Sequence, residues 1–315
     1  MNSRLKSISI LILFFICAYL DYANYQFSIQ VISVGIIISA IALYLSSEQF
    51  LDNSRALGYR YGLRGKHVGF YLVSVAAIVD EIFVVSIALS RGYGEIAFGT
   101  IQGSNVISLA LFLLFLPLMY AAPLRKNRRD SAVIFVSAIL LIAAAVKGTF
   151  LLATAVGAAL IALFAIYIVL DLRFPGSEKQ ESVEDEKFSI PSMVIAVGAL
   201  FVASDLLVIL TGETVDHLGL SGFAAGFIFP GIVGTLPELV MFVLSHRRYN
   251  QEATVGVVTG TTIYKGTLLL GLAMIISDVN VSAGTDSVLA LTVLASVLLG
   301  YSLLARERKV GSLRS

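Results

Sequence analysis

The sequence predicts an all-α polytopic membrane protein, and three observations support that prediction. Apolar residues make up 57% of the 315 residues, charged residues only 14%, and the mean hydropathy is +0.89. The apolar runs are long and continuous, whereas the strands of a membrane barrel alternate apolar with polar residues. Helices satisfy their own backbone hydrogen bonds in lipid, so runs of this kind suit transmembrane helices. The composition excludes a soluble globular domain.

About ten apolar runs have the length that a membrane crossing needs. They cover 7–20, 31–46, 68–90, 96–120, 131–147, 150–170, 192–212, 220–245, 253–276 and 287–305. Two basic residues, Arg4 and Lys6, precede the first run, so it could be a retained helix or a signal peptide. No small-x-small cleavage site follows it cleanly, which favours a retained helix.

Basic residues predict the orientation, because cytoplasmic loops hold the excess of Lys and Arg. In the ten-helix arrangement, all of the 22 Lys and Arg except Arg91, Lys147 and Lys265 fall on the side of the N-terminus. We therefore expect a multi-pass protein of the cell membrane with both termini in the cytoplasm. Arg91 and Lys147 each lie beside an outer turn, whereas Lys265 is the one basic residue with no loop to occupy.

A polar and acidic segment after the sixth run separates five helices from five, and we interpret it as a cytoplasmic linker. The expected organisation is an N-terminal extra helix or signal anchor at 1–30, a first repeat half at 31–170, the linker at 171–191, a second repeat half at 192–305 and a cytoplasmic tail at 306–315.

The two halves are related by an internal repeat. A shift of 157 residues lays Glu81 on Glu238, Glu48 on Asp205, Arg91 on Arg248, Gly99 on Gly256, Gly103 on Gly260 and Ser104 on Thr261. In the ten-helix arrangement the two related segments cross in opposite directions, so the repeats have inverted topology. Inverted repeats place a shared site near the midplane, at the interface of the halves.

Each repeat holds an acid in one helix, a short loop, and Gly-x-x-x-Gly followed by a hydroxyl residue in the next helix. Glycines four residues apart allow close backbone approach, and hydroxyl and amide oxygens are ligands for hard cations. In the second repeat we expect Gly231, Gly234 and Pro237 to interrupt the helix before Glu238 and to free carbonyl oxygens.

Two stretches resemble a known family. GTLPELVMFVLSHRRYNQEATVGVVTGTT is similar to the second α-repeat, and DEIFVVSIALSRGYGEIAFGTIQGSN to the first α-repeat, of the sodium/calcium exchanger branch of the calcium/cation antiporter superfamily. The similarity spans roughly 32–304. It implies inverted five-helix halves with paired acids at the centre, and exchange of Ca²⁺ for Na⁺ or H⁺ by alternating access.

The resemblance also implies the cation ligands. The two essential acids of the family match Glu81 and Glu238, and the candidate metal ligands are completed by Ser104, Thr261, Thr235, Asn105 and Ser108. Departures from the family lie in the same motifs. Ala77, Ile78 and Asp80 stand where the family has Thr, Ser and Pro, and Ser108 and Lys265 stand where it has Asn or Asp. The sodium stoichiometry of the family therefore does not carry over.

Lys265 and Asp80 are the residues expected to alter ion coupling. A charged Lys265 with Glu81 and Glu238 gives a site of net charge −1, which suits a monovalent cation better than a divalent one. An ionised, inward-facing Asp80 restores −2, but adjacent helical residues point about 100° apart. We expect the buried ammonium to replace one coupling cation; the alternative is that Lys265 snorkels to an interface.

Three functions remain to be compared: a Ca²⁺ antiporter, a monovalent cation/proton antiporter, and a transport-inactive relative. An intramembrane hydrolase using Asp80 and Asp205 is disfavoured, because neither lies in a Gly-x-Gly-Asp setting and no HExxH or GxSxG motif occurs. We expect no enzyme activity, no catalytic residue and no cofactor. The expected partners are the lipid bilayer and the transported cations, with no nucleic acid and no obligate protein partner.

Two further expectations concern the ends of the helices. Glu48 and Asp205 lie away from the central acids, and we interpret them as gating or helix-end residues. Compared with the family, the chain has an extra helix before the first repeat and lacks the last helix after the second. We hypothesise that the N-terminal helix takes the place of the missing one.

Overall fold

The computed structural model describes residues 3–22, 28–60, 75–115, 128–147, 149–173, 188–247, 251–277 and 281–304, and all its regular elements are helices. In chain order these are α1 (Ser3–Tyr22), α2 (Ile29–Arg60), α4 (Val79–Ser90), α5 (Gly94–Phe115), α7 (Arg128–Lys147), α8 (Phe150–Arg173), α9 (Ile190–Leu218), α10 (Gly222–Arg247), α11 (Gln251–Ile263), the π-helix η2 (Tyr264–Leu269), α12 (Leu270–Ile276), the 3₁₀ helix η3 (Val281–Gly284) and α13 (Thr285–Leu304).

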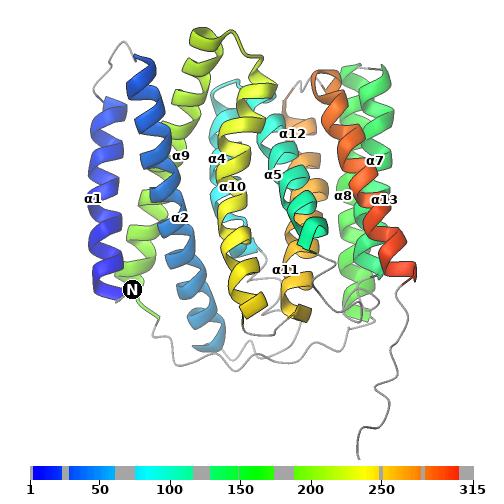
Figure 1. The fold of residues 1–315 in the computed structure, drawn as a ribbon, viewed down its shortest axis with the longest axis horizontal. Helices are drawn as coiled ribbons and strands as arrows, with labels where there is room; N and C mark the ends of the chain where they lie inside the picture. The colour runs from blue at the N-terminus through cyan, green and yellow to red at the C-terminus, as the bar shows by residue number, and fades with distance from the viewer. Residues whose placement is uncertain are drawn as a thin grey trace, which may run out of the picture.

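The helices stand side by side in a single bundle (Figure 1), and seven spans among the described residues are long and apolar enough to cross a membrane. Two shorter apolar stretches, Leu5–Leu20 and Gly222–Leu236, lie on α1 and α10. Apolar side chains such as Phe15 and Ile12 remain exposed on α1, as expected for a surface that faces lipid. The prediction of an all-α polytopic membrane protein is confirmed.

The helix bounds reproduce the internal repeat. Adding 157 to the bounds of α7 gives the bounds of α13, and adding it to the start of α5 gives the start of α11. The related helices α2 and α9 run in opposite directions (Figure 1). The two halves are therefore inverted repeats, as the sequence predicts.

Glycines bring α5 and α10 into backbone contact at the centre of the bundle. A Cβ atom added to Gly99 would collide with the Phe223 carbonyl oxygen, and one added to Gly226 with the Ile96 carbonyl oxygen. A Cβ on Gly103 would lie 2.6 Å from the Phe227 carbonyl oxygen. The close approach expected of the Gly-x-x-x-Gly motif is thus confirmed for the first repeat.

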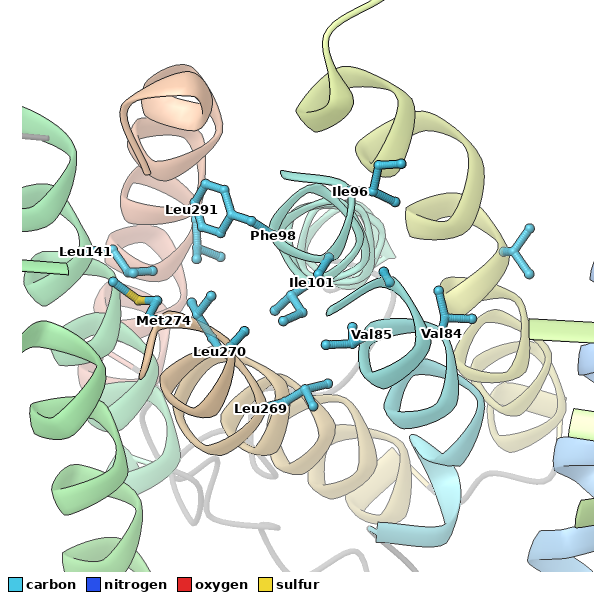
Figure 2. Close-up of a cluster of buried hydrophobic side chains, with 14 of the residues drawn as sticks. Val84, Val85, Ile96, Phe98, Ile101, Leu141, Leu269, Leu270, Met274 and Leu291 are labelled. Atoms are coloured by element: carbon cyan, nitrogen blue, oxygen red, sulfur yellow. The ribbon is translucent and has the colours of Figure 1, made fainter. Parts of the chain in front are cut away.

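Apolar side chains pack the helices on the other side of α5. Figure 2 shows Val85 of α4, Ile101 and Phe98 of α5, Leu269 of η2 and Leu291 of α13 converging in one core. This core fixes α4 and η2, the two elements that carry Glu81 and Lys265, against α5. The site described below is therefore held by a close-packed interior.

The position of α1 contradicts the hypothesis that it replaces a missing last helix. The repeat partner of α8 would have to pack on α5 and α13, because α8 itself packs on α12 and α7. Instead α1 packs on α9 and α2, at the opposite end of the bundle from α13 (Figure 1). It is an addition to the α2–α9 pair, without a counterpart in the second half of the described chain.

A candidate cation site at the crossing of the repeats

Two acids occupy the first turn of α4, which begins inside the bundle. Ile78 precedes it with φ −112° and ψ 16°, outside the helical region, so the chain turns here before α4 starts. Asp80 and Glu81 are only 2% and 3% exposed. The positive end of a helix dipole stabilises nearby carboxylates, which favours acids at this position. The turn in the chain also lets both side chains line one recess, although they are adjacent in sequence.

The Glu81 carboxylate lies directly against α10. A Cβ atom on Gly234 would be 2.6 Å from Glu81 Oε1, so only glycine leaves space for the acid. The recess around it is lined by Leu43, Asp80, Glu81, Val84, Thr100, Pro230, Val233 and Gly234. Among these described side chains the recess has no room for a water molecule.

The expected interruption before Glu238 is wrong: α10 runs without a break through Gly231, Gly234 and Pro237. Packing against α5 supports the helix where proline removes a hydrogen bond, as neighbouring helices commonly do in membranes. Pro237 still cannot donate to the carbonyl oxygen of Val233, one turn earlier. Val233 lines the recess. Its carbonyl oxygen lacks the usual helical donor because proline has no N–H group, which agrees with that part of the prediction.

Lys265 reaches Glu81 from the second half of the chain. Its Nζ donates to Glu81 Oε1 at 3.3 Å, and the lysine is 0% exposed. This burial excludes the snorkelling alternative. Lys265 belongs to η2, a π-helix within the continuous helical stretch from α11 to α12, and π-helical turns inside α-helices are frequent at functional sites.

Three predicted hydroxyl ligands are buried but bond to their own helices. Ser104 donates to Ile101 O at 3.2 Å, Thr235 to Ile232 O at 2.7 Å and Thr261 to Val258 O at 3.2 Å. Each hydroxyl oxygen keeps lone pairs that could accept a cation. Ser108, the repeat counterpart of Lys265, is 6% exposed and also buried.

Two buried amides on α5 have no hydrogen-bond partner among the described residues. Both side-chain polar atoms of Asn105 and of Gln102 are unsatisfied, and both residues are 0% exposed. The Asn105 amide faces η2, since a Cβ on Gly266 would lie 3.3 Å from its Nδ2. Unsatisfied buried amides cost about 1–3 kcal/mol each, which favours a role in holding water or a cation.

Sequence reasoning missed Gln102 and Thr100. Thr100 lines the recess with its hydroxyl bonded to Ile96 O at 2.8 Å. It lies one turn before Ser104, so helical spacing could have identified it. Gln102 could have been identified as an amide two residues before Ser104 in a predicted membrane helix. Glu238 lies on α10 one turn beyond Gly234, but its side chain is outside the described part of the structure.

The described groups can bind a cation only after a rearrangement. Asp80, Glu81 and Lys265 carry a net charge of −1 when all are ionised, and the ammonium holds one carboxylate oxygen. Across the described residues, no three acids, histidines or cysteines come together as a metal cluster. In the described part of the structure, the Lys265 ammonium therefore occupies the Glu81 Oε1 atom that a cation ligand would offer.

Comparison with known proteins decides the family. The family model described as sodium/calcium exchanger protein matches residues 31–173 and 188–314. The chain belongs to this family. Both halves of the exchanger are covered, including Glu81 on the first stretch and Lys265 on the second.

Two relatives have informative names. A protein of Alkalimonas amylolytica, described as a candidate antiporter named CaxA, is 21% identical over 89% of this chain and 92% of its own length. The sodium/calcium exchanger MaX1 of Methanosarcina acetivorans is 31% identical, but over only 27% of this chain and 26% of its own.

Solved structures confirm the fold. The H⁺/Ca²⁺ exchanger CAX superposes with a TM-score of 0.65 at 16% identity, covering 97% of this chain and 93% of that one. The sodium-calcium exchanger NCX_Mj superposes with a TM-score of 0.57 at 18% identity, covering 88% and 93%. The exchanger therefore shares the architecture of proteins that differ in their coupling ion.

Proposed function

We propose that this exchanger is a secondary active cation antiporter that exchanges Ca²⁺ for Na⁺ or H⁺ by alternating access, with Lys265 altering the ion coupling. The observation that carries the proposal is the buried contact between Lys265 Nζ and Glu81 Oε1. It supports a tethered cation at the point where the two halves of the exchanger cross.

Competition between the ammonium and a free cation supplies the coupling. A transported cation that binds Glu81 Oε1 competes with Nζ, because the ammonium already donates to that oxygen. When that cation leaves, the ammonium can return, since lysine carries its charge on a flexible four-carbon stem. The charge of the Glu81 carboxylate is thus balanced whether the transported cation is bound or absent. A buried carboxylate without a nearby positive charge would be costly.

The charge of the site bears on the choice of ion. With the ammonium displaced, Asp80 and Glu81 supply two negative charges next to neutral oxygens, which are ligands that Ca²⁺ prefers. Because Lys265 replaces one coupling ion, we expect fewer Na⁺ per cycle than in relatives with an acid or amide at this position. If the ammonium instead gives up its proton when the site opens, the exchange is coupled to H⁺.

A monovalent cation/proton antiporter is the second candidate. The positive charge of Lys265 favours it, because the ammonium cancels one of the negative charges that a divalent cation would need. A transport-inactive relative is the third, and would show no flux of any cation. In all three cases we expect the chain to lie in the lipid bilayer of the cell membrane with cytoplasmic termini and to have no enzyme activity or cofactor. In the two antiporter cases the expected ligands are the transported cations.

Isotope flux in proteoliposomes tests the proposal. The purified exchanger is assayed for ⁴⁵Ca²⁺ uptake driven by an outward Na⁺ gradient or a pH gradient, and for monovalent cation/proton exchange with a pH-sensitive dye. We expect Lys265→Asp to strengthen Ca²⁺ uptake or its Na⁺ dependence. Lys179→Asp, the same substitution in the linker, is the matched control. Unchanged transport in Lys265→Asp would rule out the role of the lysine.

A further inference from the structure

A second ion pair joins the two halves of the exchanger away from the cation site. Arg91, which follows α4, donates from Nε to Asp205 Oδ1 at 2.8 Å and from Nη2 to Asp205 Oδ2 at 2.7 Å. Asp205 lies in α9, and its side chain is 14% exposed against 40% for Arg91. Two parallel bonds between a guanidinium and a carboxylate fix geometry as well as charge.

Asp205 belongs to a group of three helices that carries neither Glu81 nor Lys265. In this group, α2 packs closely on α9, where a Cβ on Gly35 would lie 2.5 Å from Leu210 Cδ1. The helix α1 packs on both. Figure 1 shows these helices at one end of the bundle. We call α1, α2 and α9 the outer group, and α4, α5, α10 and η2 the site group.

Polar contacts tie the outer group together at the edge where α1 begins. Lys6 of α1 donates to Asp52 at 2.9 Å and lies 3.1 Å from Glu48, both on α2. Gln49 of α2 then donates to the carbonyl oxygen of Ser192 on α9 at 2.8 Å. The three helices are therefore fastened to one another and have the contacts needed to move as a unit.

The two repeat-related acids have different partners. Asp205 bonds across to the site group through Arg91, and the adjacent turn adds Tyr93, whose ring lies 3.4 Å from a Cβ placed on Gly212 of α9. Its counterpart Glu48 is paired with Lys6 inside the outer group. The two acids are therefore related in sequence, but the Glu48 pair lies within the outer group and the Asp205 pair joins the outer group to the site group.

We propose that Arg91 and Asp205 form a latch that closes the exchanger at the edge of the α4–α5 turn and opens in each transport cycle. This proposal rests on the proposed function in one respect, which is that the protein moves through a transport cycle. Alternating access requires one group of helices to move against the other around the site. An ion pair between the groups then stabilises the state that is closed on the side of the α4–α5 turn. Loss of the pair shifts the population toward the state that is open on that side.

Thiol labelling tests the latch without any measurement of flux. The single cysteine, Cys17, is buried and is replaced by Ser, and Val84→Cys places a reporter in the recess beside Glu81. In vesicles, a membrane-impermeant methanethiosulfonate reagent is added from the side of the α4–α5 turn. We expect Arg91→Gln and Asp205→Asn each to raise the labelling rate about fivefold, in line with a partly exposed two-bond ion pair.

Two further variants make the outcome decisive. The exchange Arg91→Asp with Asp205→Arg should return the labelling rate toward that of the parent. Glu213→Gln is the matched control, because Glu213 lies on the same helix but pairs with His217 within α9. An unchanged rate in both single variants, or no recovery in the exchanged pair, would overturn the latch. Loss of flux for every cation with an intact labelling response would overturn the proposed function instead.

Discussion

Lys265–Glu81 and Arg91–Asp205 each join the two halves of the exchanger, but they differ in environment and geometry. Lys265 and Glu81 meet through one contact of 3.3 Å, and their side chains are 0% and 3% exposed. Arg91 and Asp205 meet through two bonds of 2.7–2.8 Å, and their side chains are 40% and 14% exposed. The buried pair has the weaker geometry and the larger electrostatic consequence, because removing either partner leaves a desolvated charge. The exposed pair is well formed but is partly screened by solvent.

We therefore expect the two pairs to have different functions. Under the proposed function the buried ammonium competes with a transported cation, whereas under the latch proposal the directional, partly exposed pair opens and closes. Three predictions test this contrast, beginning with the largest expected effect.

Glu81→Gln should have the largest effect. The substitution leaves the Lys265 ammonium buried without its carboxylate, and breaking a buried pair costs about 3–5 kcal/mol. We expect a large fall in the melting temperature in detergent and no measurable cation flux. Adding Lys265→Met to Glu81→Gln should restore most of the thermal stability but not the flux. If the single variant melts like the parent, the ion pair does not hold the site together.

Gly234→Ala should have an intermediate effect. The new methyl group would lie 2.6 Å from Glu81 Oε1 and 2.9 Å from its Cγ, so the carboxylate has to move away from α10. Overpacking of this kind costs about 1–3 kcal/mol, although alanine is the better helix former. We expect a lower melting temperature and weaker cation uptake.

Gly300→Ala is the matched control for that substitution. Gly300 lies on α13, and nothing approaches within 4 Å of the position of its added Cβ. The variant should melt at or slightly above the temperature of the parent. Equal behaviour of the two alanine variants would show that Glu81 is free to leave α10.

Salt should have the smallest effect, and on the exposed pair alone. Raising the ionic strength from about 0.01 M to about 1 M shortens the screening distance from about 30 Å to about 3 Å. We expect the labelling rate of Val84→Cys to rise about twofold as the Arg91–Asp205 pair weakens. The difference in melting temperature between Glu81→Gln and the parent should not change with salt, because ions in solution do not screen the buried pair. A salt-independent labelling rate would argue against an electrostatic latch.

Much of the fold could be predicted from the sequence because membrane helices are defined by local composition. The apolar runs predicted the described helices within several residues at most bounds, and a shift of 157 predicted the relation of α7 to α13. The interruption was predicted in the wrong repeat. Proline suggested a break before Glu238, yet α10 is continuous, and the break precedes Glu81 at Ile78. Packing against neighbouring helices decides which weak points become breaks.

The candidate site was predicted only in part. The repeat identified Glu81, and the structure shows that Lys265 is fully buried, as an ionisable residue inside an apolar run suggested. Gln102 and Thr100 were missed because they lie outside the matched motif positions, although the fold buries both near the predicted ligands. Ser104, Thr235 and Thr261 were expected as ligands, and they remain so as a prediction, with their hydroxyls bonded to their own helices.

The sequence by itself determined the helices, the inverted repeat and the ionisable residues that the bilayer makes costly. The tertiary structure alone decided which of those residues meet. Lys265 lies 184 positions from Glu81, and Arg91 lies 114 positions from Asp205. Composition and spacing act over a few turns of one helix, whereas an ion pair between helices depends on how their faces pack. That packing placed Lys265 against Glu81 and Arg91 against Asp205.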